Sequence, residues 1–298
     1  MIAARLLTPA TRLLLVFQGL LVLTGGTVRV TESGMGCPTW PECTDGSYTP
    51  VPHQAEGQLH AWIEFGNRLL TFALFAAAIA VIAHVLITRR KDLRVLAFGQ
   101  LLGILGQGVL GGITVLTNLH PLPVAGHLLL SIVLIAGAAS LNDRRESPVN
   151  RIAVKEKVVA NLSLAHIALS FCVIVLGTLV TGSGPHAGDL KARRFGFDIR
   201  TVAWIHADAV IALLGLTLAL YIATRTNALH RRRIAIFTVV AISQGAIGYI
   251  QYFTGLPEII VAAHLLGATL VWIAAWRIRI AITTSPIAAP VSNAGENR

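Results

Sequence analysis

Long apolar segments alternate with short polar ones along almost the whole chain. A helix needs roughly 20 mostly apolar residues to cross the hydrocarbon core of a bilayer. Eight segments meet that requirement, at about residues 12–30, 61–87, 95–117, 124–142, 158–181, 202–223, 234–254 and 259–281. Because backbone groups in lipid must be hydrogen-bonded within the chain, the pattern predicts an all-α integral membrane protein with eight transmembrane helices.

The polar segments differ in charge according to the end of the predicted helices that they join. Lys and Arg concentrate in the loops that face the cytoplasm. With the N-terminus inside, the inner segments hold 18 of the 24 Lys and Arg residues, and the outer segment 31–59 holds none. The sequence therefore predicts a multi-pass protein of the plasma membrane whose N- and C-termini, including the tail 285–298, are cytoplasmic.

The two halves of the chain resemble each other. The stretch "QGVLGGITVLTNLHPLPVAGHLLLS" from Gln107 matches "QGAIGYIQYFTGLPEIIVAAHLLGA" from Gln244, and each glutamine precedes a histidine, His127 or His264, by 20 residues. Each unit has four predicted helices, so both copies share one orientation, as in a parallel repeat. We expect two four-helix bundles side by side, formed by residues 1–145 and 146–284.

Composition agrees with a membrane location and changes the interpretation of the charge. The chain is 54% hydrophobic and 13% charged, against about 25% charged residues in a soluble domain. A net charge of +10 could indicate nucleic-acid binding, but the charges lie between the apolar segments. Such clusters fit loops beside an anionic membrane surface, so we expect a lipid bilayer and no nucleic acid as partner.

Histidines within the predicted helices are candidates for function, because ionisable residues inside a membrane usually are. His206 is expected near the outer end of the sixth helix and His264 near the outer end of the eighth. Two facing imidazoles in a four-helix bundle are typical of a bis-histidine haem site. The alternative is that each histidine only hydrogen-bonds a neighbouring helix.

The first half keeps only part of this pattern. His127 is the counterpart of His264, but no histidine matches His206, which aligns with Glu64 by the shared "AWI" motif and with Asn67 by spacing. A first-half pocket would then bind its ligand through His127 and leave the opposite side open. An open coordination position on the bound molecule suits chemistry on that molecule, whereas a site closed by two histidines suits electron transfer.

The second predicted helix carries a polar stripe. His60, Glu64 and Asn67 share one helix face, and Arg68 follows Glu64 by four residues, so it can pair with Glu64 or with a ligand carboxylate. A buried carboxylate here is typical of a general acid or base. The alternative is a structural ion pair between Glu64 and Arg68.

Two of the three cysteines, Cys37 and Cys43, lie six residues apart in the predicted outer loop. Disulfides persist outside the cytoplasm, so the pair is either a structural staple or a redox-active pair beside an active site. Cys172 lies in the middle of a predicted span and is expected to be an inert core residue. His120, in another outer loop, could edge a pocket.

Four motifs, "GGTVRVTESGMGCPTWPEC", "WIEFGNRLLT", "VAGHLL" and "VAAHLLGA", together resemble haem A synthases, the bacterial relatives of mitochondrial Cox fifteen-type proteins, with actinobacterial members most similar. The resemblance spans roughly residues 12–282. It implies an enzyme that oxidises the C8 methyl of haem O to a formyl group, giving haem A for terminal oxidases.

The resemblance also implies roles for individual residues. His206 and His264 would hold a haem b cofactor, His127 the substrate haem O, Glu64 would be catalytic, and the loop cysteines could form a disulfide. Haem O synthase and a membrane redox donor or acceptor are the expected partners, and the chain could form a homo-oligomer.

One position departs from the family pattern. Many members carry "ExxHR" on the second helix, where the histidine ligates the substrate haem, but this chain reads "EFGNR" with Asn67 there. Asparagine is a poor haem ligand. Two alternatives follow: five-coordinate binding through His127 alone, or replacement of the missing histidine by His60.

Two other classes of protein fit the sequence less well. A di-haem b-type electron-transfer protein needs two bis-histidine sites, and the first half lacks one histidine. A transporter with a parallel repeat predicts broken helices and a site at the middle of the membrane, whereas the polar residues here cluster near the outer helix ends.

Overall fold

The computed structural model describes residues 2–146, 149–151, 154 and 156–286, and these residues form eight long helices. The helices are α1 (Ile2–Val30), α2 (Gln58–Ile87), α3 (Arg94–Leu116), α4 (Pro121–Asp143), α5 (Lys157–Ser183), α6 (Ile199–Ala223), α7 (Ala228–Phe253) and α8 (Glu258–Thr283). Every one contains a span long and apolar enough to cross a membrane. The prediction of an all-α, eight-helix membrane protein is confirmed.

Three short elements complete the described chain. A 3-10 helix, η1 (Lys91–Leu93), precedes α3, and a two-stranded antiparallel sheet joins β1 (Val149–Arg151) to β2 (Thr284–Pro286). Residues 287–298 of the predicted cytoplasmic tail lie outside the described residues.

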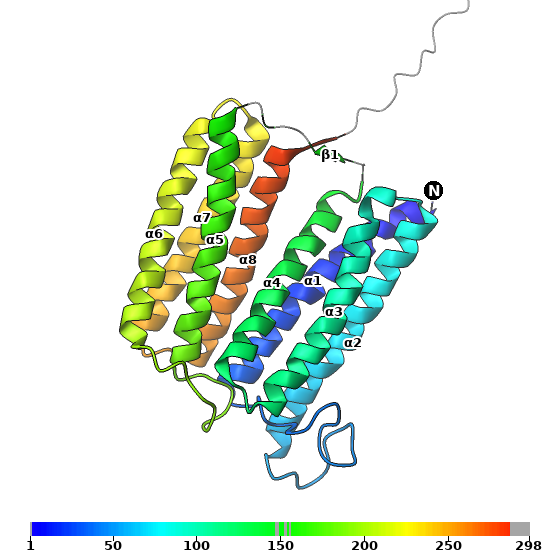
Figure 1. Ribbon diagram of the computed structural model, residues 1–298, viewed down its shortest axis with the longest axis vertical. Helices are drawn as coiled ribbons and strands as arrows, with labels where there is room; N and C mark the ends of the chain where they lie inside the picture. Colours follow the sequence, from blue (N-terminus) through cyan, green and yellow to red (C-terminus); the bar gives the residue numbers. More distant parts are fainter. Residues whose placement is uncertain (1, 147–148, 152–153, 155, 287–298) are drawn as a thin grey trace, which may run out of the picture.

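The helices form two groups of four (Figure 1). Helices α1–α4 make the N-terminal group and α5–α8 the C-terminal group, and α8 packs against both α1 and α4 where the groups meet. The segment 31–57, called the cysteine loop below, projects from one end of the N-terminal group, and the β1–β2 sheet lies at the opposite end. We call the end with the cysteine loop the loop side.

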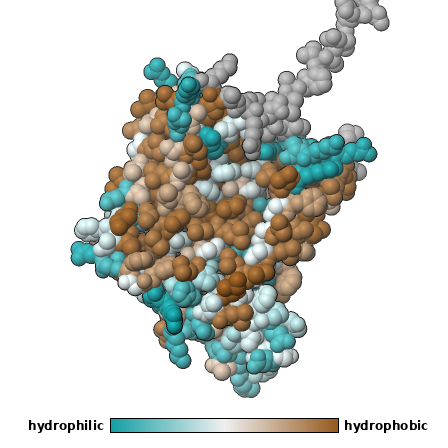
Figure 2. All heavy atoms as spheres, in the orientation of Figure 1, coloured by the Kyte–Doolittle hydropathy of each residue, from teal (hydrophilic) through white to brown (hydrophobic). Residues whose placement is uncertain are grey.

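The surface agrees with a membrane location. Figure 2 shows hydrophobic side chains over the middle of both groups and more hydrophilic ones towards the two ends. Large side chains such as Phe72, Val95 and Leu102 are exposed on the helices, as expected where lipid rather than water covers them.

The predicted helix ranges lie within the observed ones to within a residue, except that α1 begins about ten residues earlier than expected. Leu7, Ala10 and Leu14 explain the extension, because they pack into the core of the N-terminal group. One expectation is wrong: Cys172 is exposed on the surface of α5 rather than part of the core, since its position on the helix turns it away from the packed face.

The turns between α3 and α4 and between α7 and α8 have the same form. Asn118 and Leu119 both have positive φ, and the Leu119 N–H donates to the Thr114 carbonyl at 2.8 Å. Gly255 and Leu256 repeat the pattern, with the Leu256 N–H bonded to the carbonyl of residue 251 at 2.8 Å. The shared turn supports the predicted internal repeat, which stays a prediction.

Candidate functional site

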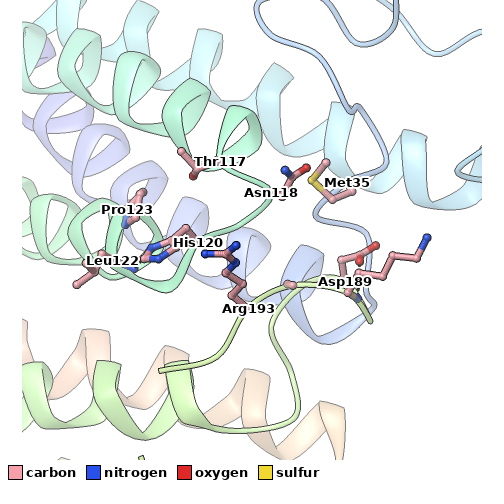
Figure 3. A pocket seen from close by; sticks show the side chains of 10 residues that line it. Met35, Thr117, Asn118, His120, Leu122, Pro123, Asp189 and Arg193 are labelled. Carbon is pink, nitrogen blue, oxygen red and sulfur yellow. Dashed lines mark hydrogen bonds between the residues drawn. The ribbon is translucent and has the colours of Figure 1, made fainter. Parts of the chain in front are cut away.

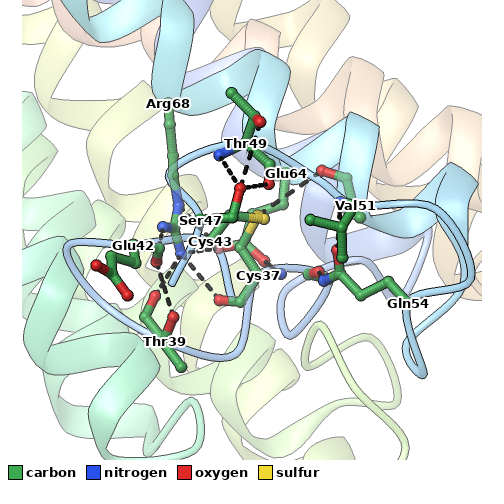
Figure 4. Close-up of a disulfide and its surroundings, with 12 residues drawn as sticks. Cys37, Thr39, Glu42, Cys43, Ser47, Thr49, Val51, Gln54, Glu64 and Arg68 are labelled. Carbon is green, nitrogen blue, oxygen red and sulfur yellow. Dashed lines mark hydrogen bonds and ion pairs between the residues drawn. A yellow bond between two sulfur atoms is a disulfide. The ribbon is translucent and has the colours of Figure 1, made fainter. Parts of the chain in front are cut away.

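The cysteine loop is closed by the predicted disulfide. Cys37 and Cys43 are bonded and fully buried, although the loop is polar in composition. Figure 4 shows the disulfide against the end of α2, where Glu64 and Arg68 lie. The loop is therefore attached to the helix that carries the predicted polar stripe.

Arg68 connects α2 to the backbone of this loop. Its guanidinium donates to the carbonyls of Glu42 (3.0 Å), Cys37 (2.9 Å) and Thr39 (3.2 Å), as Figure 4 shows. A planar guanidinium with five donors suits such multiple bonding. One side chain thus fixes the path of the chain through the disulfide ring.

Glu64 lies between Arg68 and the loop. Arg68 Nη2 donates to Glu64 Oε1 at 2.7 Å, and the Cys37 N–H donates to Oε2 at 2.7 Å. The residue is 6% exposed. Charge-assisted bonds from both sides stabilise and orient the carboxylate. The predicted Glu64–Arg68 ion pair is present, and it leaves Glu64 at the wall of a cavity.

That cavity, the main cavity, has a volume of about 660 Å³ and lies within the N-terminal group. Its size falls within the range of about 300–1,000 Å³ typical of cofactor and ligand pockets. Helices α1–α4 form most of its walls, residues of α5, α8 and the α5–α6 loop complete them, and loop residues Trp40, Pro41 and Tyr48 cover it. The predicted site residues Glu64, Asn67, Arg68 and His127 all line it, so the fold brings them together.

Helix α3 positions His127. Gln107 Nε2 donates to the His127 carbonyl at 3.1 Å and to Ser131 Oγ at 2.6 Å. The ring packs against Gly111, where a Cβ atom would come within 3.2 Å of Nε2. The glycine therefore lets the imidazole lie close to the α3 backbone.

The C-terminal group repeats this arrangement. Gln244 Nε2 donates to the His264 carbonyl at 2.7 Å, and His264 packs against Gly248, where a Cβ atom would lie 3.1 Å from the ring. His206 likewise packs against Gly177 of α5. The 20-residue spacing seen in the sequence thus has a physical basis, because the glutamine holds the backbone of the histidine.

His206 and His264 lie close enough to interact electrostatically, and neither of their buried Nδ1 atoms has a hydrogen-bond partner among the described residues. Buried polar atoms normally have partners. His206 on α6 and His264 on α8 are the residues that would hold a haem in this group.

Asn67 takes the place in the N-terminal group that His206 has in the other. Thr24 Oγ1 lies 2.7 Å from Asn67 Oδ1, and Gly25 lies beside its amide, so Asn67 faces α1 as His206 faces α5. This supports the alignment by spacing over the alignment by "AWI", because Glu64 turns to the cysteine loop instead.

His60 is not among the described residues that line the main cavity. Its Nδ1 lies 3.0 Å from Ser33 Oγ, at the start of the cysteine loop. This position does not support His60 as a replacement for the missing ligand. Gly111 and Gly248 were missed by the sequence interpretation, although each precedes its histidine by the same number of residues.

Comparison with known proteins agrees with these features. The family model COX15-CtaA, described as a cytochrome oxidase assembly protein, matches residues 10–188, which include the cysteine loop and most of helices α1–α4. A protein of Shewanella oneidensis named heme A synthase is 31% identical over 190 residues, covering 59% of this chain and 56% of its own length.

Two further relatives carry the same name. The Lysinibacillus sphaericus protein is 30% identical over 122 residues, 40% of this chain and 38% of the relative. The Azorhizobium caulinodans protein is 26% identical over 311 aligned positions, 86% of this chain and 88% of the relative. The matches thus span about half or less of the first two relatives and most of the third. The family model covers more than half of the chain, which therefore belongs to the COX15-CtaA family of cytochrome oxidase assembly proteins.

Proposed function

We propose that this protein is a haem A synthase, an oxidoreductase that converts the C8 methyl of haem O to a formyl group. The observation that carries the proposal is the difference between the two helix groups. One has a paired-histidine site, whereas the other has a cavity with a single histidine, His127, and a buried carboxylate, Glu64. Relatives named heme A synthase support the same activity.

His206 and His264 hold haem b in this proposal, and the bound haem supplies electron transfer. The orphan Nδ1 atoms and the facing glycines support the assignment. Gly177 and Gly248 let the two imidazole rings pack directly against the backbones of α5 and α7. Gln244 bonds the His264 carbonyl and so holds this part of α8 against α7. These contacts orient both imidazoles before any ligand binds, which reduces the entropy lost on binding.

His127 is the protein ligand of the substrate haem O, and Asn67 leaves the opposite side open. Glu64 lies at the cavity wall, where the C8 methyl would face it. It would accept the protons released as the methyl is oxidised through hydroxylated intermediates, while the electrons would pass to the proposed membrane redox partner. Arg68 holds the Glu64 carboxylate in position. The disulfide holds the backbone that donates to the other carboxylate oxygen.

The proposed orientation in the plasma membrane puts the loop side outside the cytoplasm and both termini inside. The cysteine loop, which has no Lys or Arg, then faces the side where disulfides persist. The basic residues at the opposite end, such as Arg89, Arg144 and Arg232, face the cytoplasm, as the positive-inside rule requires. Haem O synthase, a membrane redox partner and a second copy of the chain are the proposed partners.

Two variants test this division of roles in protein co-expressed with a haem O synthase. His264→Ala should lose the b-type absorption of the purified protein. His127→Ala should keep that absorption and form no haem A. His230→Ala, whose ring is bonded to the Ala281 carbonyl at the opposite end, is the control and should match the wild type. Normal haem A yield from His127→Ala would contradict the proposal.

A further inference from the structure

A second cavity, of about 920 Å³, opens on the loop side (Figure 3). We call it the loop-side cavity. Its lining comes from three segments: the cysteine loop, the turn between α3 and α4, and the loop between α5 and α6. Its polar and charged lining residues include Asn118, His120, Asp189, Lys191 and Arg193.

The two cavities share a wall that is one residue thick. Leu119 lines the main cavity, while its neighbours Asn118 and His120 line the loop-side cavity. Gly34 and Gly188 likewise line the main cavity, and the next residues, Met35 and Asp189, line the loop-side cavity. The same three segments therefore face both cavities.

Leu119 packs across two glycines in this wall. The Gly34 N–H donates to the Gly188 carbonyl at 2.8 Å. A Cβ atom would come within 2.8 Å of Leu119 Cδ1 at Gly34 and within 3.1 Å at Gly188. Both positions need glycine for the leucine to lie there. One hydrogen bond and one apolar side chain thus separate the two spaces.

The cations of this region fall into two classes. Arg194 donates to the carbonyls of Ala192 and Pro185, both at 2.6 Å, so it holds the loop together. The side chains of Lys191 and Arg193, in contrast, make no hydrogen bond or ion pair with any residue that the structure describes. They are free to bind an anion from outside the chain.

The main cavity offers no such cation. Arg29 and Arg68, the two arginines that line it, are both bonded to the chain. Arg29 donates to the carbonyls of His186 and Thr181, and Arg68 to Glu64 and the cysteine loop. A porphyrin carries two carboxylates on one edge, and these need partners when the ring enters an apolar cavity.

We propose that the loop-side cavity, which lies beside the main cavity, binds the carboxylates of the porphyrin substrate through Lys191 and Arg193. The inference rests on the proposed function for the identity of the substrate. Leu119 is then the side chain that separates the bound carboxylates from the space for the ring. Anionic lipid headgroups carry similar oxygen atoms and are the competing occupant.

A titration with metal-free protoporphyrin IX and its dimethyl ester tests the site without turnover. The full chain is placed in nanodiscs of zwitterionic lipid, and tryptophan quenching reports binding. Arg193→Gln should weaken binding of the diacid about tenfold, the loss of one strong charge-assisted contact, and Lys191→Gln with Arg193→Gln should weaken it further. The ester should bind all variants equally.

Arg200→Gln is the matched control, because Arg200 lies at the same end, over the ring of Trp204, and outside both cavities. It should leave diacid binding unchanged. Unchanged binding in the paired variant, or equal binding of diacid and ester by the wild type, would overturn the proposal. A loss seen only in nanodiscs with anionic lipid would assign the site to headgroups and also overturn it.

Conversion of haem O in the same preparations separates the two proposals. If the paired variant needs a higher haem O concentration for conversion than the wild type, both the proposed function and the anion site are supported. Wild-type protein that binds the diacid through Arg193 but forms no haem A would remove the proposed function and keep the anion site. If the paired variant binds the diacid normally and still forms haem A, the anion site is removed and the proposed function is kept.

Discussion

The carboxylate of Glu64 is held by two structural elements at once. Arg68 reaches it from one turn along α2, and the Cys37 N–H reaches it from the disulfide-bonded loop. The carboxylate therefore has a fixed position at the wall of the main cavity, which is what a group that exchanges protons with a bound substrate requires.

Glu64→Gln keeps the size of the side chain and removes its charge. Haem A formation should fall by about 10²–10⁴-fold, the range for general acid–base catalysis, while the b-type absorption persists. Chromatography of extracted haems measures both. The control is Glu42→Gln, because Glu42 bonds the Gly46 N–H within the exposed part of the cysteine loop. Wild-type yield from Glu64→Gln would remove this residue from the mechanism.

Arg68→Lys keeps the charge but loses the guanidinium that bonds three loop carbonyls. The free energy of unfolding should fall by about 2 kcal/mol, since hydrogen bonds to charged groups contribute about 1.5–3 kcal/mol each and lysine replaces only part of them. Limited proteolysis should cut the cysteine loop faster than in Arg200→Lys. Equal cleavage rates in the two variants would show that Arg68 does not anchor the loop.

Helices α4 and α8 are each held by a neighbouring helix in the same way. A glutamine on α3 or α7 bonds the histidine backbone, and a glycine one turn further along lets the ring approach. The position of His127 thus depends on the packing of α3 against α4, and that of His264 on the packing of α7 against α8.

Gly248→Val tests this arrangement. The new side chain would meet the His264 ring, because even a Cβ atom comes within 3.1 Å, so the b-type absorption of the purified protein should be lost. Gly245→Val on the same helix has open space around it and changes the helix propensity by the same amount, so it should retain the absorption. Loss in both variants would point to a general defect of α7.

Much of the fold followed from the sequence because apolar segments of this length have one stable form in lipid. The Gln–His spacing has a counterpart in the structure, because each glutamine bonds the backbone of its histidine, whereas the internal repeat and the role of Asn67 stay predictions. Other features depend on distant segments and could not be predicted from local pattern. The contact of His60 with Ser33 needs the path of the cysteine loop. The exposed face of Cys172 depends on the rotation of α5.

The two helix groups are connected by polar contacts as well as by apolar packing. Trp272 Nε1 on α8 donates to the Ile132 carbonyl on α4 at 2.7 Å, and Trp276 Nε1 donates to Ser140 Oγ at 2.8 Å. Asp143, at the end of α4, pairs with Arg233 of α7 at 2.9 Å and with Arg277 of α8 at 3.2 Å. The ion pairs lie at the end opposite the proposed site.

Asp143→Asn should lower the thermal unfolding temperature, because two half-buried arginines lose the charge of their shared partner, at a cost of about 1–3 kcal/mol. Asp92, which is 32% exposed against 10% for Asp143, pairs with the single arginine Arg90 two residues before it, so Asp92→Asn should cost about 0–1 kcal/mol. Tryptophan fluorescence in detergent follows both transitions. Equal shifts in the two variants would mean that Asp143 does not hold the groups together.

The most direct test of the proposed function is chromatography of haems extracted from membranes that contain this protein together with a haem O synthase. The account predicts haem A or its hydroxylated intermediate, with haem b bound to the purified protein. Haem O left unconverted, in membranes where the protein is folded and carries haem b, would contradict the synthase and favour an electron carrier.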